Sequence, residues 1–282
     1  LTSLSFSALQ IGALLSLFQI SRIFAPNFLG WIADRSGEYI KWIKISSFFG
    51  FILFIGIFWA NSFLSIFLII MAMSIFTSST LPLAESLTLA HLKANKADSK
   101  YSHIRLWGSI GFIVAAILLG IMIDSIGEKS LIYALLLTQL VIFLLAFILP
   151  TKKVIFLPKK KRSIWPILKK REVVVLLLSC ALMVSSHGLL YNFYSIFLEQ
   201  QGYSGTTIGL LWAVGVIFEI IIFLLMPRIL NKFTLKAVLL ISLGFAVIRF
   251  FLIGAYVDSM ILLFIAQVMH ALIVTDVECY FK

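Results

Sequence analysis

The stretch WAVGVIFEIIIFLLM, residues 212–226, places one carboxylate, Glu219, among fourteen uncharged and mostly apolar side chains. The apolar block around it runs from about residue 206 to 230. That is longer than the roughly 20 residues that a helix needs to cross the hydrocarbon layer. A charged side chain at the centre of a spanning helix costs about 2.5–3.5 kcal/mol on insertion scales. We therefore predict a transmembrane helix here and a functional role for Glu219.

The composition of the whole chain supports the same class. The 282 residues are 61% hydrophobic and only 12% charged, whereas a soluble domain has roughly 25% charged residues. No apolar block shows the strict alternation of a membrane β-barrel strand. We predict an all-α polytopic membrane protein whose nine spans lie near 8–33, 42–60, 63–90, 104–126, 129–149, 172–199, 206–230, 235–256 and 259–276.

The net charge of +11 comes from basic residues that gather in alternate connectors. Nineteen of the 23 Lys and Arg lie in four stretches, 34–44, 93–105, 151–171 and 228–236. Cytoplasmic loops carry such an excess of Lys and Arg, so we place these four stretches in the cytoplasm. The charge thus indicates a multi-pass protein of the cell membrane and not a nucleic-acid-binding protein. We expect the longest basic stretch to contact anionic lipids.

The segment 150–171 is the one long polar connector, and it suggests a division into two halves. We predict an N-terminal bundle at 1–149, a cytoplasmic linker at 150–171 and a C-terminal bundle at 172–282. An offset of 197 residues aligns 7–75 with 204–272 without gaps and with 11 identities. Both copies start on the same side of the membrane, as in transporters built from parallel repeats.

The same offset predicts helices that the chain does not contain. The helix at 172–199 has no counterpart before Leu1, and two helices of the first half have none after the last block. We therefore expect this chain to hold helices 2 to 10 of a twelve-helix protein.

One connector carries a family resemblance. The stretch GWIADRSGEYIK, residues 30–41, resembles the loop between helices 2 and 3 of the major facilitator superfamily. Gly30, Asp34, Arg35 and Gly37 match the superfamily pattern, while Glu38-Tyr39 replaces its basic pair. Stretches across most of the chain further resemble the phenylpropionate permease group, which is close to nucleoside and oligosaccharide proton symporters: 101–113, 187–204, 208–223 and 247–255.

The resemblance implies a secondary active transporter and not an enzyme. It implies alternating access, with two bundles that rock around a site near the bilayer midplane. We expect proton-coupled uptake of a small organic solute, such as an aromatic acid, a nucleoside or a sugar, by a monomer in a bacterial inner membrane. Gly30, Asp34, Arg35 and Gly37 would form a gating loop on the cytoplasmic side. Proton-coupled efflux of hydrophobic cations and a non-transporting sensor with this fold are the alternatives.

Three ionisable residues on successive predicted helices are the candidates for proton coupling: Glu219, Arg249 and His270. Glu219 would bind a proton when it loses water and release it when Arg249 approaches, because a nearby cation favours the ionised carboxylate. His270 would relay the proton or bind the solute. The alternative is a static pair of Glu219 and Arg249 that joins two helices.

Five further residues are candidates for solute binding: His187, Tyr191, Asn192, Tyr194 and Glu85. The first four lie on the helix that opens the second half, and their rings and amide suit a polar or aromatic ligand. Hydrogen bonds within the bundle would explain His187 equally well, and access to cytoplasmic water would explain Glu85. No glycine-rich phosphate loop and no metal-ligand spacing occurs, so we expect no cofactor and no metal.

Overall fold

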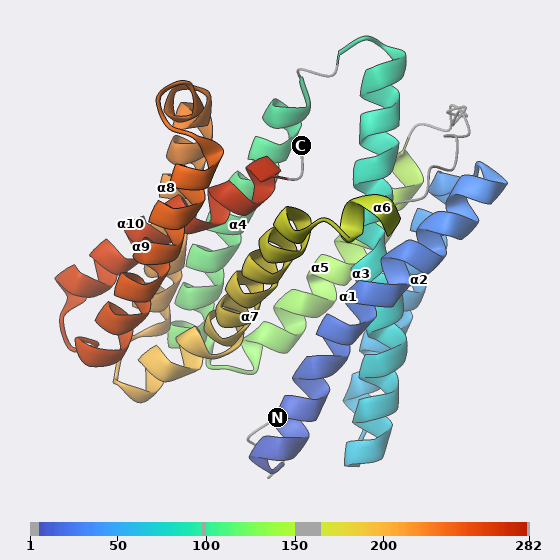
Figure 1. Cartoon of the computed structure of the whole chain (residues 1–282). Helices are drawn as coiled ribbons and strands as arrows, with labels where there is room; N and C mark the ends of the chain where they lie inside the picture. Colours follow the sequence, from blue (N-terminus) through green and yellow to red (C-terminus); the bar gives the residue numbers. More distant parts are fainter. Residues whose placement is uncertain (1–5, 98–99, 150–164, 281–282) are drawn as a thin grey trace. The chain divides into compact units, whose positions relative to one another are not determined.

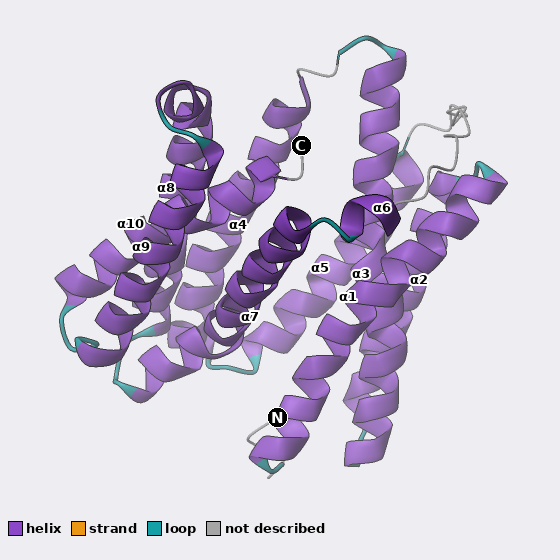
Figure 2. Cartoon of the chain, in the orientation of Figure 1, coloured by secondary structure: helices purple, strands orange, loops and turns teal. Residues whose placement is uncertain are grey.

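The computed structural model describes residues 6–97, 100–149 and 165–280. Every regular element in these ranges is helical (Figure 2), which confirms the predicted all-α class. The elements are α1 Ala8–Ser36, α2 Tyr39–Gly56, the 3₁₀ turn η2 Ile57–Trp59, α3 Phe63–Ala94, α4 Tyr101–Ile126, α5 Ser130–Ile148, α6 Trp165–Leu168, α7 Arg171–Gln200, α8 Gly205–Lys232, α9 Leu235–Ala255 and α10 Met260–Tyr280.

Eight helices in the described part are long and apolar enough to cross a membrane, namely α1 to α5 and α7 to α9. They correspond to the first eight predicted spans. The ninth predicted span corresponds to α10, whose apolar segment Met260–Leu272 is shorter than a full span.

The helices form two compact units. The first unit comprises Leu1–Ser102 and Ile132–Lys159 and contains α1, α2, α3 and α5. Within it α3 packs against both α1 and α2 (Figure 1). Its core has one apolar layer around Leu14 of α1 and Ile66 of α3 and another around Leu29 and Leu83.

The second unit comprises His103–Leu131 and Lys160–Lys282, and it contains α4 and α7 to α10. Here α10 packs against both α8 and α9. Leu198, Leu211 and Leu263 form the centre of its largest apolar cluster. The contacts thus group α4 with the later helices. The predicted bundle boundaries stay a prediction, and most of the predicted linker, 150–164, lies outside the described residues.

The helix starts follow the 197-residue repeat. Ser7 caps α1 and Ser204 caps α8 with nearly the same extended backbone and with a side chain that accepts from the amide three residues on. The third helices of the two copies start at Phe63 and Met260, which are also 197 residues apart. Each third helix packs on the two helices before it in its own copy. The two copies therefore repeat a three-helix packing unit as well as a sequence register.

Candidate functional site

Glu219 lies near the middle of α8, with a half-buried side chain. It makes no ion pair within 4.0 Å with Arg249, although both residues are described. Arg105 of α4 acts on its carboxylate only at longer range, because no ion pair joins these two described residues either. Glu219 and Arg249 therefore do not form a static ion pair in this structure, and the approach of Arg249 during proton release stays a prediction.

Small residues bring α4 and α8 into backbone contact. A Cβ at Gly209 would overlap with the carbonyl oxygen of Ala116, and one at Gly120 would overlap with that of Gly205. Further along α4 and α8, the ring centres of Phe112 and Trp212 lie 6.4 Å apart. The residue numbers of α4 fall along these contacts as those of α8 rise, so the two helices are antiparallel. The same pairing, continued along both helices, places Arg105 beside Glu219.

Asp124 joins the same two helices at the start of α8. Its Oδ1 accepts from the backbone N–H of Gly205 at 2.6 Å, and its Oδ2 accepts from the N–H and the hydroxyl of Thr206 at 2.7 and 2.5 Å. A carboxylate is favourable here because a helix N-terminus presents unpaired N–H groups and a partial positive charge. Asp124 therefore caps a helix other than its own.

Arg249 is fully buried on α9. Its Nη1 lies 3.3 Å from Nε2 of His187 on α7, and Nδ1 of that histidine lies 2.9 Å from the carbonyl oxygen of Met183. A guanidinium can only donate, so Nε2 accepts and Nδ1 donates, which makes His187 a neutral imidazole. The two other guanidinium nitrogens, Nε and Nη2, are buried and have no hydrogen-bond partner in the described part of the chain.

The facing part of α10 contributes two more buried polar side chains, Gln267 and His270. A Cβ at Gly215 of α8 would lie 3.1 Å from Oε1 of Gln267 and 3.5 Å from Cδ2 of His270. The glycine therefore lets α8 approach these two side chains closely. Both polar atoms of the Gln267 amide and Nδ1 of His270 lack a partner among the described residues.

Aromatic rings surround these polar groups. His187 stacks on His270 with a centroid distance of 5.5 Å, and Tyr191 stacks on Trp212 at 5.8 Å. The hydroxyl of Tyr191 lies 3.4 Å from Nε2 of His270. Tyr194 is buried beside Trp212, and its hydroxyl lies near Gln267 without a hydrogen bond in the described structure. Three of the four predicted ligands on α7 thus lie in one cluster with Arg249 and His270.

Other predicted residues lie elsewhere. Asn192 donates to the carbonyl oxygen of Gly188, one turn back in its own helix, at 2.6 Å. Glu85 lies on α3 of the first unit with an exposed side chain. Arg22, another ionisable residue inside a predicted span, is also exposed, on α1. None of these three shows a contact that assigns it a role.

The predicted gating loop is the turn between α1 and α2. Asp34 accepts a hydrogen bond from the hydroxyl of Tyr39, and the Arg35 guanidinium lies 5.6 Å from the centre of the Trp31 ring. Gly37 ends α1 in the left-handed region, at φ 68°, where a side chain would be strained. Gly30 lies within α1 and has open space around it.

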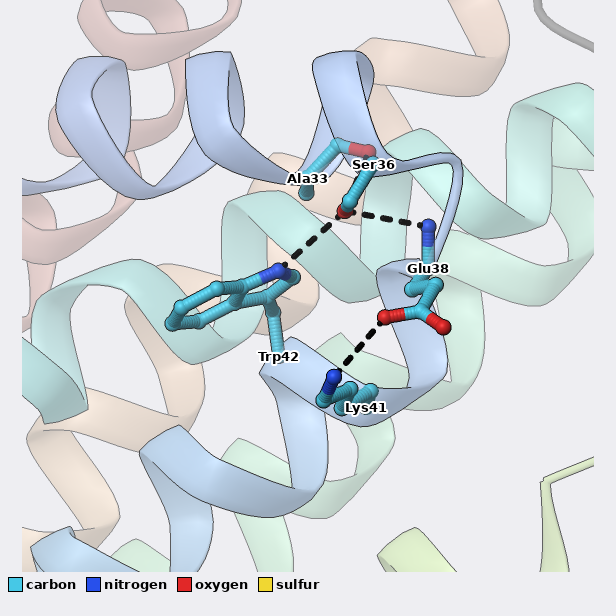
Figure 3. A network of polar contacts seen from close by, with 5 residues as sticks. All are labelled: Ala33, Ser36, Glu38, Lys41 and Trp42. Atoms are coloured by element: carbon cyan, nitrogen blue, oxygen red, sulfur yellow. Dashed lines mark hydrogen bonds and ion pairs between the residues drawn. The ribbon is translucent and has the colours of Figure 1, made fainter.

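Polar contacts close this turn (Figure 3). The hydroxyl of Ser36 accepts from the backbone N–H of Glu38 and from the indole N–H of Trp42, each at 3.3 Å, and Lys41 pairs with Glu38 at 3.0 Å. Glu38, which departs from the superfamily pattern, thus takes part in an ion pair within the loop.

Four residues with interactions at this site were not predicted from the sequence: Gln267, Trp212, Asp124 and Arg105. Gln267 carried a signal, because an amide inside an apolar block needs a partner. Asp124 lies at the end of an apolar block, where a carboxylate is ordinary, so only the structure reveals its contacts with α8.

Known proteins resemble this chain along most of its length. Residues 1–277 match the model of the MFS_1 like family. The chain is 29% identical to the probable 3-phenylpropionic acid transporter of Escherichia coli (strain K12) over 78% of this chain and 58% of that protein. It is 25% identical to the maltose permease of Geobacillus stearothermophilus over 84% of this chain and 60% of that protein. The chain therefore spans less than two thirds of the length of these relatives.

A solved structure has the same fold. The nucleoside transporter NupG, as its D323A mutant, superimposes with a TM-score of 0.81 at 20% identity, over 96% of this chain and 72% of that one. The fold, the membrane-length helices and the match over residues 1–277 agree with the resemblance found in the 30–41 loop. The chain belongs to the MFS_1 like family, a transporter family of the major facilitator superfamily.

Proposed function

We propose that the full-length protein is a secondary active transporter that takes up a small organic solute together with protons, and that Glu219 is the group that binds the coupled proton. The observation that supports this is the position of Glu219. Its carboxylate lies in the middle of a membrane-length helix and makes no ion pair within 4.0 Å in the described part of the chain.

A carboxyl group in this setting responds to two opposing influences. A nearby guanidinium, here that of Arg105, favours the charged form, and loss of water favours the neutral form. A conformational change that alters either influence makes Glu219 bind or release a proton. Alternating access would supply such a change by exposing the site to each side of the membrane in turn.

The test compares wild type with Glu219→Gln in proteoliposomes that contain the full-length protein. The solutes are 3-phenylpropionate, a nucleoside and maltose, after the solutes named for the relatives. We expect the variant to keep exchange of solute across the membrane and to lose accumulation driven by a pH gradient. Exchange shows that the variant is folded, so loss of accumulation alone identifies the coupling group.

Glu199→Gln is the matched control, because Glu199 is an exposed carboxylate near the end of α7. This variant should accumulate solute like wild type. Gradient-driven accumulation that survives Glu219→Gln would refute the assignment of the proton to Glu219.

A further inference from the structure

Arg249 has no anionic partner within 4.0 Å among the described residues, and its guanidinium lies 5.8 Å from the centre of the Phe250 ring. Its one hydrogen-bond partner is His187, which accepts as a neutral imidazole. A guanidinium stays protonated in proteins, and a buried charge without a partner is costly, especially within a membrane. The two buried nitrogens without partners, Nε and Nη2, are therefore the feature to explain.

Those two nitrogens form one edge of the guanidinium group. Nε–H and one N–H of Nη2 point the same way, and such a parallel pair of donors matches the two oxygens of a carboxylate. The contact to His187 uses the remaining nitrogen, Nη1. His187 therefore holds Arg249 in place and leaves free the edge that makes bidentate contacts.

The repeat shows that the three-helix fold does not require these polar groups. At the 197-residue offset, Arg249, Gln267 and His270 correspond to Ile52, Ile70 and Met73 of the first copy. That copy packs its three helices in the same pattern with apolar side chains at all three positions. Buried polar groups that the packing does not need are more often functional than structural.

The neighbours of Arg249 suit an anion that carries a flat apolar group. Ring contacts link four aromatic side chains: His187 stacks on His270, Tyr191 stacks on Trp212, and Tyr191 meets His270 edge to face. The unpaired amide of Gln267 and the Tyr194 hydroxyl add both hydrogen-bond donors and acceptors. Glu219 does not occupy the guanidinium, since the two residues form no ion pair within 4.0 Å in the described structure.

We propose that the Nε and Nη2 edge of Arg249 binds a carboxylate of the transported solute, so that the site selects a monocarboxylate over an uncharged solute of the same shape. The proposal rests on the proposed function, because it names the solute class of that transporter. It assigns Arg249 to solute recognition, separate from the proton on Glu219.

The experiment measures binding of three carboxylates and their amides to the full-length protein: acetate and acetamide, benzoate and benzamide, and 3-phenylpropionate and 3-phenylpropionamide. Each pair has one shape and differs in charge. We expect wild type to bind at least one carboxylate at least about tenfold more tightly than its amide, as a lost charged hydrogen bond implies. Arg249→Gln should abolish or invert that preference, and Arg249→Lys should keep part of it.

Arg228→Gln is the control, because it removes an exposed arginine near the end of α8 and should leave the preference unchanged. If Arg249→Gln binds an amide, that variant is folded. If Arg249→Gln binds neither member of a pair, the preference for carboxylate over amide is taken from Arg249→Lys instead. The inference is overturned if no carboxylate is favoured over its amide in wild type, or if Arg249→Gln keeps the preference. Gradient-driven uptake of maltose or a nucleoside that depends on Glu219 but not on Arg249 would leave the proposed function standing and refute this inference alone.

Discussion

Two buried serines join α1 to α3 in the first unit. The hydroxyls of Ser21 and Ser74 lie 2.6 Å apart, and the Ser74 hydroxyl also lies 2.9 Å from the carbonyl oxygen of Met71. Ser74 has one hydroxyl hydrogen, which it donates to that carbonyl, so Ser21 donates to Ser74. The two serines are therefore not equivalent, although each is a buried hydroxyl.

The direction of this hydrogen bond predicts unequal effects of two similar substitutions. Ser74→Ala removes the acceptor of a buried donor and should lower the free energy of unfolding by about 1 kcal/mol. Ser21→Ala leaves Ser74 bonded to its own helix, so it should lower the free energy of unfolding by only a few tenths of about 1 kcal/mol. The coupling energy between the two serines in the double-mutant cycle should be about 0.6 kcal/mol. Reversible unfolding in mixed detergent micelles measures all three values.

Ser16→Ala serves as the control, because Ser16 is exposed and bonds only to Ala13 of its own turn. Equal losses for Ser21→Ala and Ser74→Ala would contradict the assigned direction.

At the scale of the helix, close contact between α4 and α8 depends on the absence of side chains. Gly205 and Gly209 are four residues apart and lie on one face of α8, against Ala116 and Gly120 of α4. Small residues at this spacing let membrane helices approach until their backbones touch. The same pair of helices holds Arg105 near Glu219, so its packing sets the distance between these charges.

Gly209→Ala should separate α4 from α8, because its Cβ would overlap with a backbone carbonyl that cannot rotate away. Overpacking of this kind costs about 1–3 kcal/mol, and thermal unfolding in detergent should show a lower Tm. Gly12 is the matched control, since it occupies the equivalent position in the first copy and a Cβ there would have no neighbour within 4 Å among the described residues. Gly12→Ala should leave Tm unchanged or raise it, because alanine favours helix by up to about 1 kcal/mol. The same loss in both variants would refute the proposed role of the contact.

At the scale of the whole molecule, charge sets the orientation in the membrane. The connectors after α1, α3 and α8 are basic, as is the stretch 151–171 that follows α5 in the sequence, whereas the connectors after α2, α4, α7 and α9 are nearly free of Lys and Arg. If α1 to α5 and α7 to α9 each cross the bilayer, the connectors alternate between its two faces. Because cytoplasmic loops carry the excess of Lys and Arg, we predict that the connectors after α1, α3 and α8 lie in the cytoplasm.

Labelling of single cysteines checks this orientation. In a cysteine-free version of the full-length protein, Asp258→Cys in the connector before α10 should react with a membrane-impermeant maleimide in intact cells. Asn95→Cys at the end of α3 should react only after the membrane is permeabilised. Both side chains are exposed, so accessibility to the reagent depends on the side of the membrane. The reverse pattern would show that the charge bias does not orient this protein.

Most of the fold could be predicted from local sequence, and the errors lie at the helix ends. The predicted first span ends at residue 33, whereas α1 continues to Ser36 and stops at Gly37 in the left-handed region. Apolar composition marks the part of a helix inside the hydrocarbon, and capping geometry decides where the helix ends. At the helix starts, the repeat alignment pairs Ser7 with Ser204, and these two serines are the N-caps of α1 and α8.

The candidate site was predictable as a set of residues but not as a set of contacts. His187, Arg249 and His270 stand out in the sequence because a polar side chain in an apolar span is costly. Their grouping with Gln267, and the electrostatic partnership of Glu219 with Arg105, were not predicted. These contacts depend on how each helix is rotated against its neighbour.

The sequence by itself determined that this chain is a helical membrane protein, where its spans lie and which connectors carry the positive charge. Each of these properties follows from local composition. Hydrocarbon excludes unpaired polar groups, and Lys and Arg are enriched in the connectors on one face of the bilayer. Only the tertiary structure decided that Arg249 lies against His187 with one edge free, that Gly209 lets α4 touch α8, and that Asp124 caps another helix. The reason is that such contacts join residues up to 82 positions apart, and no local pattern encodes the rotation that brings them together.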